Sequence, residues 1–108
     1  MEKRTISIGV VGCGTVGAEV IKSLARKRKS LKEKAGLDLA VSKVYDKDTK
    51  KRSLFPSLFT SNLKDITESS DIDIVVELIG GTDAAFEVIK KALKNGKSVV
   101  TANKAVIS

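Results

Sequence analysis

Apolar residues recur along the chain at two different spacings, which separate strands from helices. Short apolar runs rich in β-branched residues are typical of strands buried in a sheet, and they cover residues 5–11, 37–46, 73–79 and 98–101. Over residues 15–34 and 83–95, apolar positions return every three to four residues, with charged residues between them. This spacing indicates amphipathic helices. Strands and helices are therefore expected to alternate along the chain.

The segment between the second and third of these strands has a weaker pattern. Residues 47–59 (KDTKKRSLFPSLF) contain the only proline, Pro56, and predict a loop that leads into a short strand at 58–60. A short helix is expected within NLKDITESS, with Asn62 as its N-cap. The complete order, β-α-β-β-α-β-α-β, predicts an α/β fold: a Rossmann-like, doubly wound parallel sheet with helices on both faces. A length of 108 residues suits one domain.

Charge narrows the class of partner. The chain carries 20 Lys and Arg against 13 Asp and Glu, a formal charge of +7, which favours nucleic acid, an anionic membrane or a phosphorylated cofactor. Aromatic residues are few, so the stacking surfaces of single-stranded nucleic-acid binders are largely missing. The basic run at residues 22–34 falls on the polar face of the first predicted helix, which favours a solvated surface. No apolar run approaches the ~20 residues that span a bilayer. A phosphorylated cofactor is therefore the favoured partner, and nucleic-acid binding through the basic helix is the least favoured alternative.

Cysteine and histidine are almost absent. The chain holds 1 Cys, Cys13, and no His. A single thiol forms no internal disulfide, and nothing in the sequence resembles a metal-ligand cluster, so we expect no metal site. The first residues, MEKRTISIG, lack the pattern of a signal peptide. We therefore expect a reducing, cytoplasmic location.

A glycine motif links the first strand to the first helix. Gly12, Gly14 and Gly17 have the spacing G-x-G-x-x-G. At a strand–helix junction the first glycine permits a tight turn, the second lets the backbone approach a pyrophosphate, and the third allows close packing of the helix. The predicted cofactor-binding loop consists of Gly12, Cys13, Gly14, Thr15, Val16 and Gly17. The alternative is a tight turn without a ligand. A helix N-terminus lowers the pKa of a thiol, so a reactive thiol is one interpretation of Cys13. This position of the motif, however, needs only a side chain that stays out of the way, and we expect Cys13 to have no redox role.

Asp46 ends the second predicted strand, where an acidic residue binds the adenosine ribose in dinucleotide-binding folds. It lies farther along than the usual ~20 residues, because the extension RKRKSLKEKAG lengthens the first helix. A solvated turn residue is the alternative. The carboxylate favours NAD, since it repels the 2′-phosphate of NADP. Lys47, Lys50, Lys51 and Arg52 follow directly and are able to neutralise that phosphate, unless they form a solvated loop. The expected cofactor is NADP or NAD, and the basic cluster favours acceptance of NADP.

Two further stretches carry a family resemblance. Residues 71–108, DIDIVVELIGGTDAAFEVIKKALKNGKSVVTANKAVIS, together with GVVGCGTVG at residues 9–17, closely resemble the cofactor domain of homoserine dehydrogenases. VVELIGG and VVTANKA, in this order, are more specific than the glycine motif. The match is weakest in the basic helix extension and in residues 47–62. The resemblance identifies residues 1–108 as an N-terminal NAD(P)-binding domain.

The resemblance implies an oxidoreductase that interconverts aspartate 4-semialdehyde and homoserine with NAD(P)H as hydride donor, in the biosynthesis of threonine and methionine. It implies that Leu78, Ile79 and Gly80 lie at the nicotinamide half of the site. Lys104 matches a family lysine near the nicotinamide and the substrate carbonyl, where it contacts the cofactor or places charge during hydride transfer. The alternative is an exposed terminal lysine. Many family members carry Arg where this chain has Tyr45, so a preference for NADP inferred from that Arg does not transfer.

The family's substrate-binding domain, with its acid/base residues, metal site and dimer interface, has no counterpart in this chain. We therefore expect the 108 residues to bind a nicotinamide dinucleotide but to turn over substrate negligibly. The missing partner is the C-terminal substrate domain, and the parent is expected to be a homo-oligomer. Another amino-acid-pathway dehydrogenase is a neighbouring interpretation, against which ELIGG and TANKA weigh. The alternative from another class is a non-catalytic nucleotide-binding regulatory or sensor domain, which has no need for Lys104.

Overall fold

The fold is a single parallel sheet with helices on both sides. The computed structural model describes residues 5–79 and 82–101. Its elements, in chain order, are β1 (Thr5–Val11), α1 (Thr15–Ala35), β2 (Asp38–Tyr45), the 3-10 helix η1 (Thr49–Ser53), β3 (Phe59–Thr60), α2 (Lys64–Thr67), β4 (Ile74–Glu77), α3 (Thr82–Lys94) and β5 (Ser98–Thr101). The five strands have the order β3-β2-β1-β4-β5, and all neighbouring pairs are parallel. The predicted doubly wound parallel sheet is confirmed.

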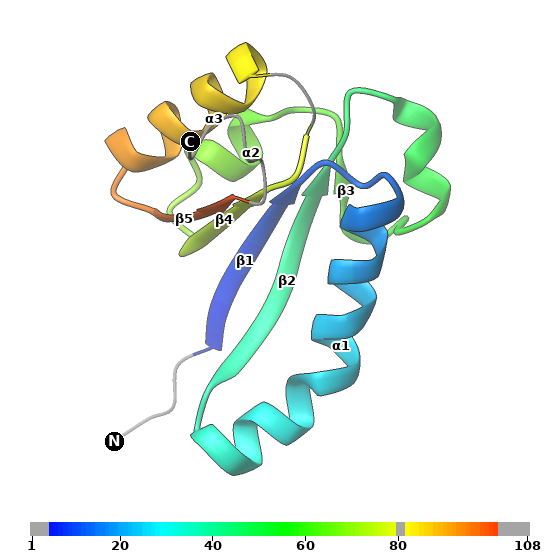
Figure 1. Cartoon of the computed structure of the whole chain (residues 1–108), viewed down its shortest axis with the longest axis vertical. Coiled ribbons are helices and arrows are strands. Elements are labelled where there is room, and N and C mark those ends of the chain that lie inside the picture. Colours follow the sequence, from blue (N-terminus) through cyan, green and yellow to red (C-terminus); the bar gives the residue numbers. More distant parts are fainter. Residues whose placement is uncertain (1–4, 80–81, 102–108) are drawn as a thin grey trace.

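Each face of the sheet buries its own core. In Figure 1, α1 lies on one side of the sheet, and α2 and α3 lie on the other. Alternating residues of β1 point to the two sides: Ile8 and Val10 pack with Ile21 of α1, whereas Val11 packs with Ile66 of α2 and with residues of α3. Because both faces are covered, the central strands are apolar almost throughout. None of the helices in the described ranges is both long and apolar enough to cross a membrane.

The strand order reverses between β1 and β4, and this reversal positions the site. From β1 the chain moves through α1 to β2 on one flank, whereas β4 and β5 lie on the other flank. The connections that leave the carboxyl ends of β1 and β4 therefore diverge. In open α/β sheets, this divergence creates the crevice in which ligands bind.

Two predicted local features need correction. Residues 49–53 were expected in a loop but form η1, since the Asp48 side chain accepts a hydrogen bond from the Lys50 backbone N–H at its start. Helix α2 begins one residue later than predicted, with Leu63 rather than Asn62 at the N-cap. The Asn62 Oδ1 atom still accepts a hydrogen bond from the Lys64 N–H, so the predicted type of interaction is present from the preceding position.

The strand and helix boundaries otherwise agree with the predictions to within two residues. Strands β1 and β5 have the predicted bounds, and β2 ends at Tyr45, just before Asp46. Strand β4 ends at Glu77 rather than at residue 79. The chain turns there because the Glu77 carboxylate accepts a hydrogen bond from the backbone N–H of Ile79, which leaves that N–H outside the sheet.

Candidate nucleotide-binding site

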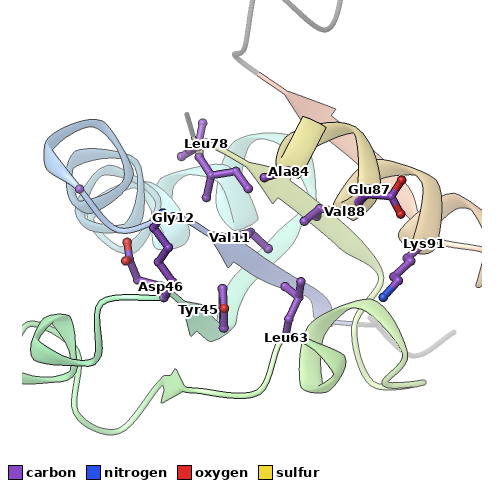
Figure 2. A pocket seen from close by; sticks show the side chains of 13 residues that line it. Val11, Gly12, Tyr45, Asp46, Leu63, Leu78, Ala84, Glu87, Val88 and Lys91 are labelled. Atoms are coloured by element: carbon purple, nitrogen blue, oxygen red, sulfur yellow. The ribbon is translucent and has the colours of Figure 1, made fainter. Parts of the chain in front are cut away.

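A cavity of about 720 Å³ opens at the carboxyl ends of β1 and β2, on the side of the sheet that carries α2 and α3. Figure 2 shows Tyr45 and Leu63 on one side of it and Ala84 and Val88 of α3 on the other, with Val11 between them. Glu87, next to Val88, and Lys91, farther along α3, also line the cavity. The walls are mostly apolar with a few charged groups, as is usual for small-molecule sites.

The first glycine of the motif shapes the turn into this cavity. Gly12 has φ +107°, a conformation that side chains of other residues rarely tolerate. A Cβ atom on Gly12 would lie 3.0 Å from the Ile79 side chain and 3.0 Å from the carbonyl carbon of Leu78. The Gly12 N–H donates a 2.7 Å hydrogen bond to the carbonyl oxygen of Tyr45. Gly12 therefore fixes the place where the ends of β1, β2 and β4 meet.

Gly17 and Gly14 differ in what surrounds them. A Cβ atom on Gly17 would lie 2.0 Å from the carbonyl oxygen of Gly12, so only glycine lets the first turn of α1 pack on the loop. A Cβ atom on Gly14 would meet none of the described atoms within 4 Å. Its φ of −72° and ψ of −161° are ordinary for any residue. Neither the local backbone nor the packing of residues 5–79 and 82–101 requires glycine at this position.

Among the residues that the structure describes, no side chain caps the N-terminus of α1. Its N-cap is Gly14, which has no side chain to bond the first N–H groups, and its first turn contains no acidic residue. The first N–H groups of any α-helix lack partners within the helix and carry a partial positive charge. Thr15 and Val16 of this turn are exposed. The turn therefore presents backbone donors suited to an anion such as a phosphate.

Asp46 lines the cavity and also braces the glycine loop. Its Oδ2 atom accepts a 3.0 Å hydrogen bond from the Cys13 N–H, and its Oδ1 atom accepts a 2.9 Å bond from the Asp48 N–H. Each carboxylate oxygen therefore already holds one backbone donor. Both oxygens retain further acceptor capacity, so these bonds are compatible with the predicted role of Asp46 in binding a ribose. That role stays a prediction.

Within the loop, Cys13 is fully buried. Burial, together with the Asp46 carboxylate beside it, raises the pKa of the Cys13 thiol to about 11. The thiol is therefore protonated at neutral pH, in spite of its place just before a helix N-terminus. A protonated, buried thiol is a poor nucleophile, in accord with the prediction that Cys13 has no redox role.

The basic residues after Asp46 divide into separate environments. Lys47 lines the cavity. The charge of Lys51 lowers the pKa of the Cys13 thiol, in opposition to the larger effects of burial and Asp46. The Arg52 guanidinium lies over the Phe59 ring, 4.9 Å from its centre. Lys47 is thus the member of the cluster that lines the candidate site.

The cavity brings together five of the predicted residues, Gly12, Gly14, Asp46, Leu78 and Ile79. Gly80 and Lys104 lie outside the described residues. Sequence reasoning missed Leu63 and the α3 residues Ala84, Val88 and Lys91. The α3 residues occupy one helical face, and their spacing was visible in the sequence. No local pattern, however, indicated which part of that face borders the cavity. In residues 5–79 and 82–101, no three Cys, Asp or Glu side chains gather as metal ligands would.

Comparison with known proteins agrees with this geometry. The family model of the homoserine dehydrogenase NAD-binding domain matches residues 12–108. The homoserine dehydrogenase of Helicobacter pylori is 39% identical over 106 residues, which are 98% of this chain and 25% of that protein. The enzyme of Corynebacterium glutamicum is 40% identical over 105 residues, 95% of this chain and 24% of its own length. The chain thus spans about a quarter of the curated relatives it matches.

Solved structures give the same result. The crystal structure of a homoserine dehydrogenase from Thiobacillus denitrificans superposes with a TM-score of 0.88 at 38% sequence identity, over 96% of this chain and 25% of that one. A putative homoserine dehydrogenase from Archaeoglobus fulgidus has a TM-score of 0.71 at 28% identity and covers 94% of this chain and 35% of that one. By sequence and by fold, the chain belongs to the family of homoserine dehydrogenase NAD-binding domains.

Proposed function

We propose that the chain binds NADP(H) or NAD(H) as the cofactor domain of an oxidoreductase that interconverts homoserine and aspartate 4-semialdehyde. The observation that carries the proposal is Gly14, where the described part of the chain gives no reason for glycine. A close approach of a ligand to the backbone supplies that reason. The uncapped first turn of α1 beside it supports the same ligand class, since it offers N–H donors to a pyrophosphate.

The strand order supports one orientation of the dinucleotide. We propose that the pyrophosphate binds at Gly14 and the first turn of α1, and that the adenosine lies toward Tyr45, Asp46 and Lys47 at the end of β2. The nicotinamide half then lies toward Leu78 and the ends of β4 and β5. When bound, the nicotinamide supplies the hydride chemistry. The residues of this chain hold and orient it and exclude water from the apolar cavity.

The contacts of Asp46 favour acceptance of NADP. Both of its oxygens hold backbone N–H groups, so part of its negative charge is already compensated, and Lys47 lies beside it in the cavity wall. A lysine at this place is able to pair with a 2′-phosphate. We expect Lys47→Ala to weaken binding of NADPH about tenfold and to leave binding of NADH within threefold of wild type. Equal losses for both cofactors would contradict this role.

Lys104, which lies outside the described residues, is proposed to contact the nicotinamide or to place charge at the substrate carbonyl. The support is its position in VVTANKA, directly after β5. Lys104→Ala is expected to weaken the binding of NADH or NADPH and to leave the binding of ADP unchanged. If wild-type chain binds ADP as tightly as the dinucleotides, the alternative of a nucleotide sensor is favoured instead.

Calorimetric titration of the 108-residue chain with NAD, NADH, NADP and NADPH tests the main proposal. Saturable binding is expected for at least one of them. Gly14→Val is expected to abolish it, because the added side chain fills the space next to the backbone donors. Ser30→Val, an equally branched side chain at an exposed position of α1, is the control and should bind as wild type. Absence of binding to all four cofactors would refute the proposal.

A further inference from the structure

Glu77 is a completely buried carboxylate that the cofactor-binding loop does not explain. Its side chain is 0% exposed, and it lies at the carboxyl end of β4, in register with Val11 of β1 and Thr101 of β5. Burial of a carboxylate is costly unless hydrogen bonds replace its water. Its place, at the strand end beside the proposed ligand crevice, raises the question of what it holds.

The two oxygens of Glu77 join two segments that leave the sheet. The Oε2 atom accepts a 2.8 Å hydrogen bond from the Ile79 N–H in the connection after β4. The Oε1 atom accepts a hydrogen bond from the Thr101 hydroxyl at the last residue of β5. Both donors are uncharged. The carboxylate therefore fixes the end of β5 relative to the start of the connection between β4 and α3.

This connection forms part of the cavity. The Ile79 side chain lines the cavity and lies close to Gly12 at the turn out of β1. The N–H of the preceding residue, Leu78, donates a 2.9 Å hydrogen bond to the carbonyl oxygen of Val11. Loss of the Glu77 acceptor would remove one of the hydrogen bonds that hold the wall formed by Leu78 and Ile79 in its place over Gly12.

We infer that Glu77 is a positioning residue for the nicotinamide half of the site, acting through the Ile79 N–H and the Thr101 hydroxyl. The inference rests on the proposed function, which assigns the ends of β4 and β5 to that half. A carboxylate suits this task because one rigid group accepts both hydrogen bonds. Glutamine offers one carbonyl acceptor for the Ile79 N–H and an amide donor for the Thr101 oxygen, so Glu77→Gln should retain much of the function.

The opposite end of the sheet contains a matched control. There the Thr5 hydroxyl donates a 2.8 Å hydrogen bond to the Asp38 carboxylate, again between neighbouring parallel strands. Thr101→Val and Thr5→Val each remove one Thr–carboxylate hydrogen bond and keep a branched side chain. A purely structural bond lowers the unfolding temperature in both variants. Only a positioning bond changes how the nicotinamide half of the ligand is held.

The experiment measures calorimetric affinities of wild type and variants for NADH, NADPH and ADP, with unfolding temperatures alongside. Thr101→Val is expected to lower the affinity for the more tightly bound dinucleotide about tenfold. The affinity for ADP should fall less than twofold, since ADP lacks the nicotinamide half. Thr5→Val should leave all affinities unchanged. Glu77→Leu, which removes both acceptors, should lose more dinucleotide affinity than Thr101→Val does. Glu77→Gln should keep the affinity within threefold of wild type.

The other outcomes overturn the inference. Proportional weakening of ADP and dinucleotide in Thr101→Val indicates a general structural effect, and unchanged affinity in that variant removes the positioning role. Either result leaves the proposed function intact if wild type binds dinucleotide. Failure of wild type to bind any dinucleotide refutes the proposed function, and this inference with it. Thr101→Val decides the matter even if Glu77→Leu does not fold.

Discussion

The described structure requires glycine at Gly12 and Gly17 but not at Gly14, and substitutions separate these positions. Gly17→Ala places a Cβ atom 2.0 Å from the Gly12 carbonyl oxygen. Helix propensity alone predicts a gain of about 1 kcal/mol for Ala over Gly, but the clash with the backbone is expected to reverse the sign and destabilise by about 3 kcal/mol. Gly14→Val should cost at most about 1 kcal/mol, the usual penalty of an apolar N-cap.

Urea denaturation of both glycine variants measures these differences in the free energy of unfolding. A stabilised Gly17→Ala variant would mean that α1 is able to move away from the loop. A large loss of stability in Gly14→Val would mean that the chain itself needs glycine there. That second result would remove the main argument for a ligand at this position.

Cys13 is expected to resist thiol reagents in the native chain. Its pKa is raised from 9.0 to about 11, first by burial and then by Asp46, so almost no thiolate exists at pH 8. Reaction with a chromogenic disulfide at pH 8 should be slow in buffer and fast in denaturant. Rapid native labelling would contradict the buried, protonated state.

The same pKa shift also affects stability in alkali. Since the native state holds the thiol proton more tightly than the unfolded state, the stabilisation is complete below pH 9 and is lost as pH rises toward 11. Cys13→Ala has no such group. The difference in unfolding free energy between wild type and Cys13→Ala should therefore change only above pH 9, in the direction that disfavours wild type.

The three elements β1, α1 and β2 are joined at the amino end of the sheet by Asp38. The Arg28 guanidinium of α1 donates hydrogen bonds of 2.6 Å and 3.1 Å to its carboxylate, and Thr5 of β1 donates another. These bonds hold the pKa of Asp38 at about 2, below its ordinary 3.8. Because the folded pKa is lowered, the stabilisation is present above pH 4 and is lost as pH falls toward 2.

Thermal unfolding of wild type and Asp38→Asn between pH 2 and pH 7 tests this prediction. Wild type should be the more stable at pH 5 to 7, where the carboxylate is charged. The advantage should shrink through the window from about 4 to about 2 that the pKa values of Asp38 define. An advantage that stays constant across this window would show that the charge of Asp38 contributes nothing.

At the level of elements, sequence patterns predicted every strand and both long helices, because strand and helix periodicities are local. Gly36 illustrates this: it has φ +70°, and its N–H bonds to the Lys32 carbonyl oxygen at the predicted end of α1. Helix η1 was missed. Its start depends on the Asp46 and Asp48 side chains, which accept backbone hydrogen bonds. The loop prediction rested on Pro56 and did not take these hydrogen bonds into account.

The chain as a unit is expected to bind cofactor without appreciable turnover. It spans about a quarter of the homoserine dehydrogenases it matches, and family resemblance assigns substrate groups to the part it does not cover. Oxidation of homoserine by the 108-residue chain, followed by the absorbance of NADPH, should stay at the buffer rate under conditions where calorimetry detects cofactor binding. Turnover at the rate of a full-length relative would refute this division of roles.

The sequence was sufficient for the class of fold and the class of ligand, because both depend on short-range patterns: a buried strand, three spaced glycines and an amphipathic helix. Only folding brought together pairs far apart in the chain. Gly9, unexplained by sequence, lies where a Cβ atom would be 2.6 Å from Ile66 of α2. Asp46 meets the Cys13 N–H, and Glu77 meets Thr101. These contacts depend on strand order and register, which no local periodicity encodes, and they determine how rigidly the site is held.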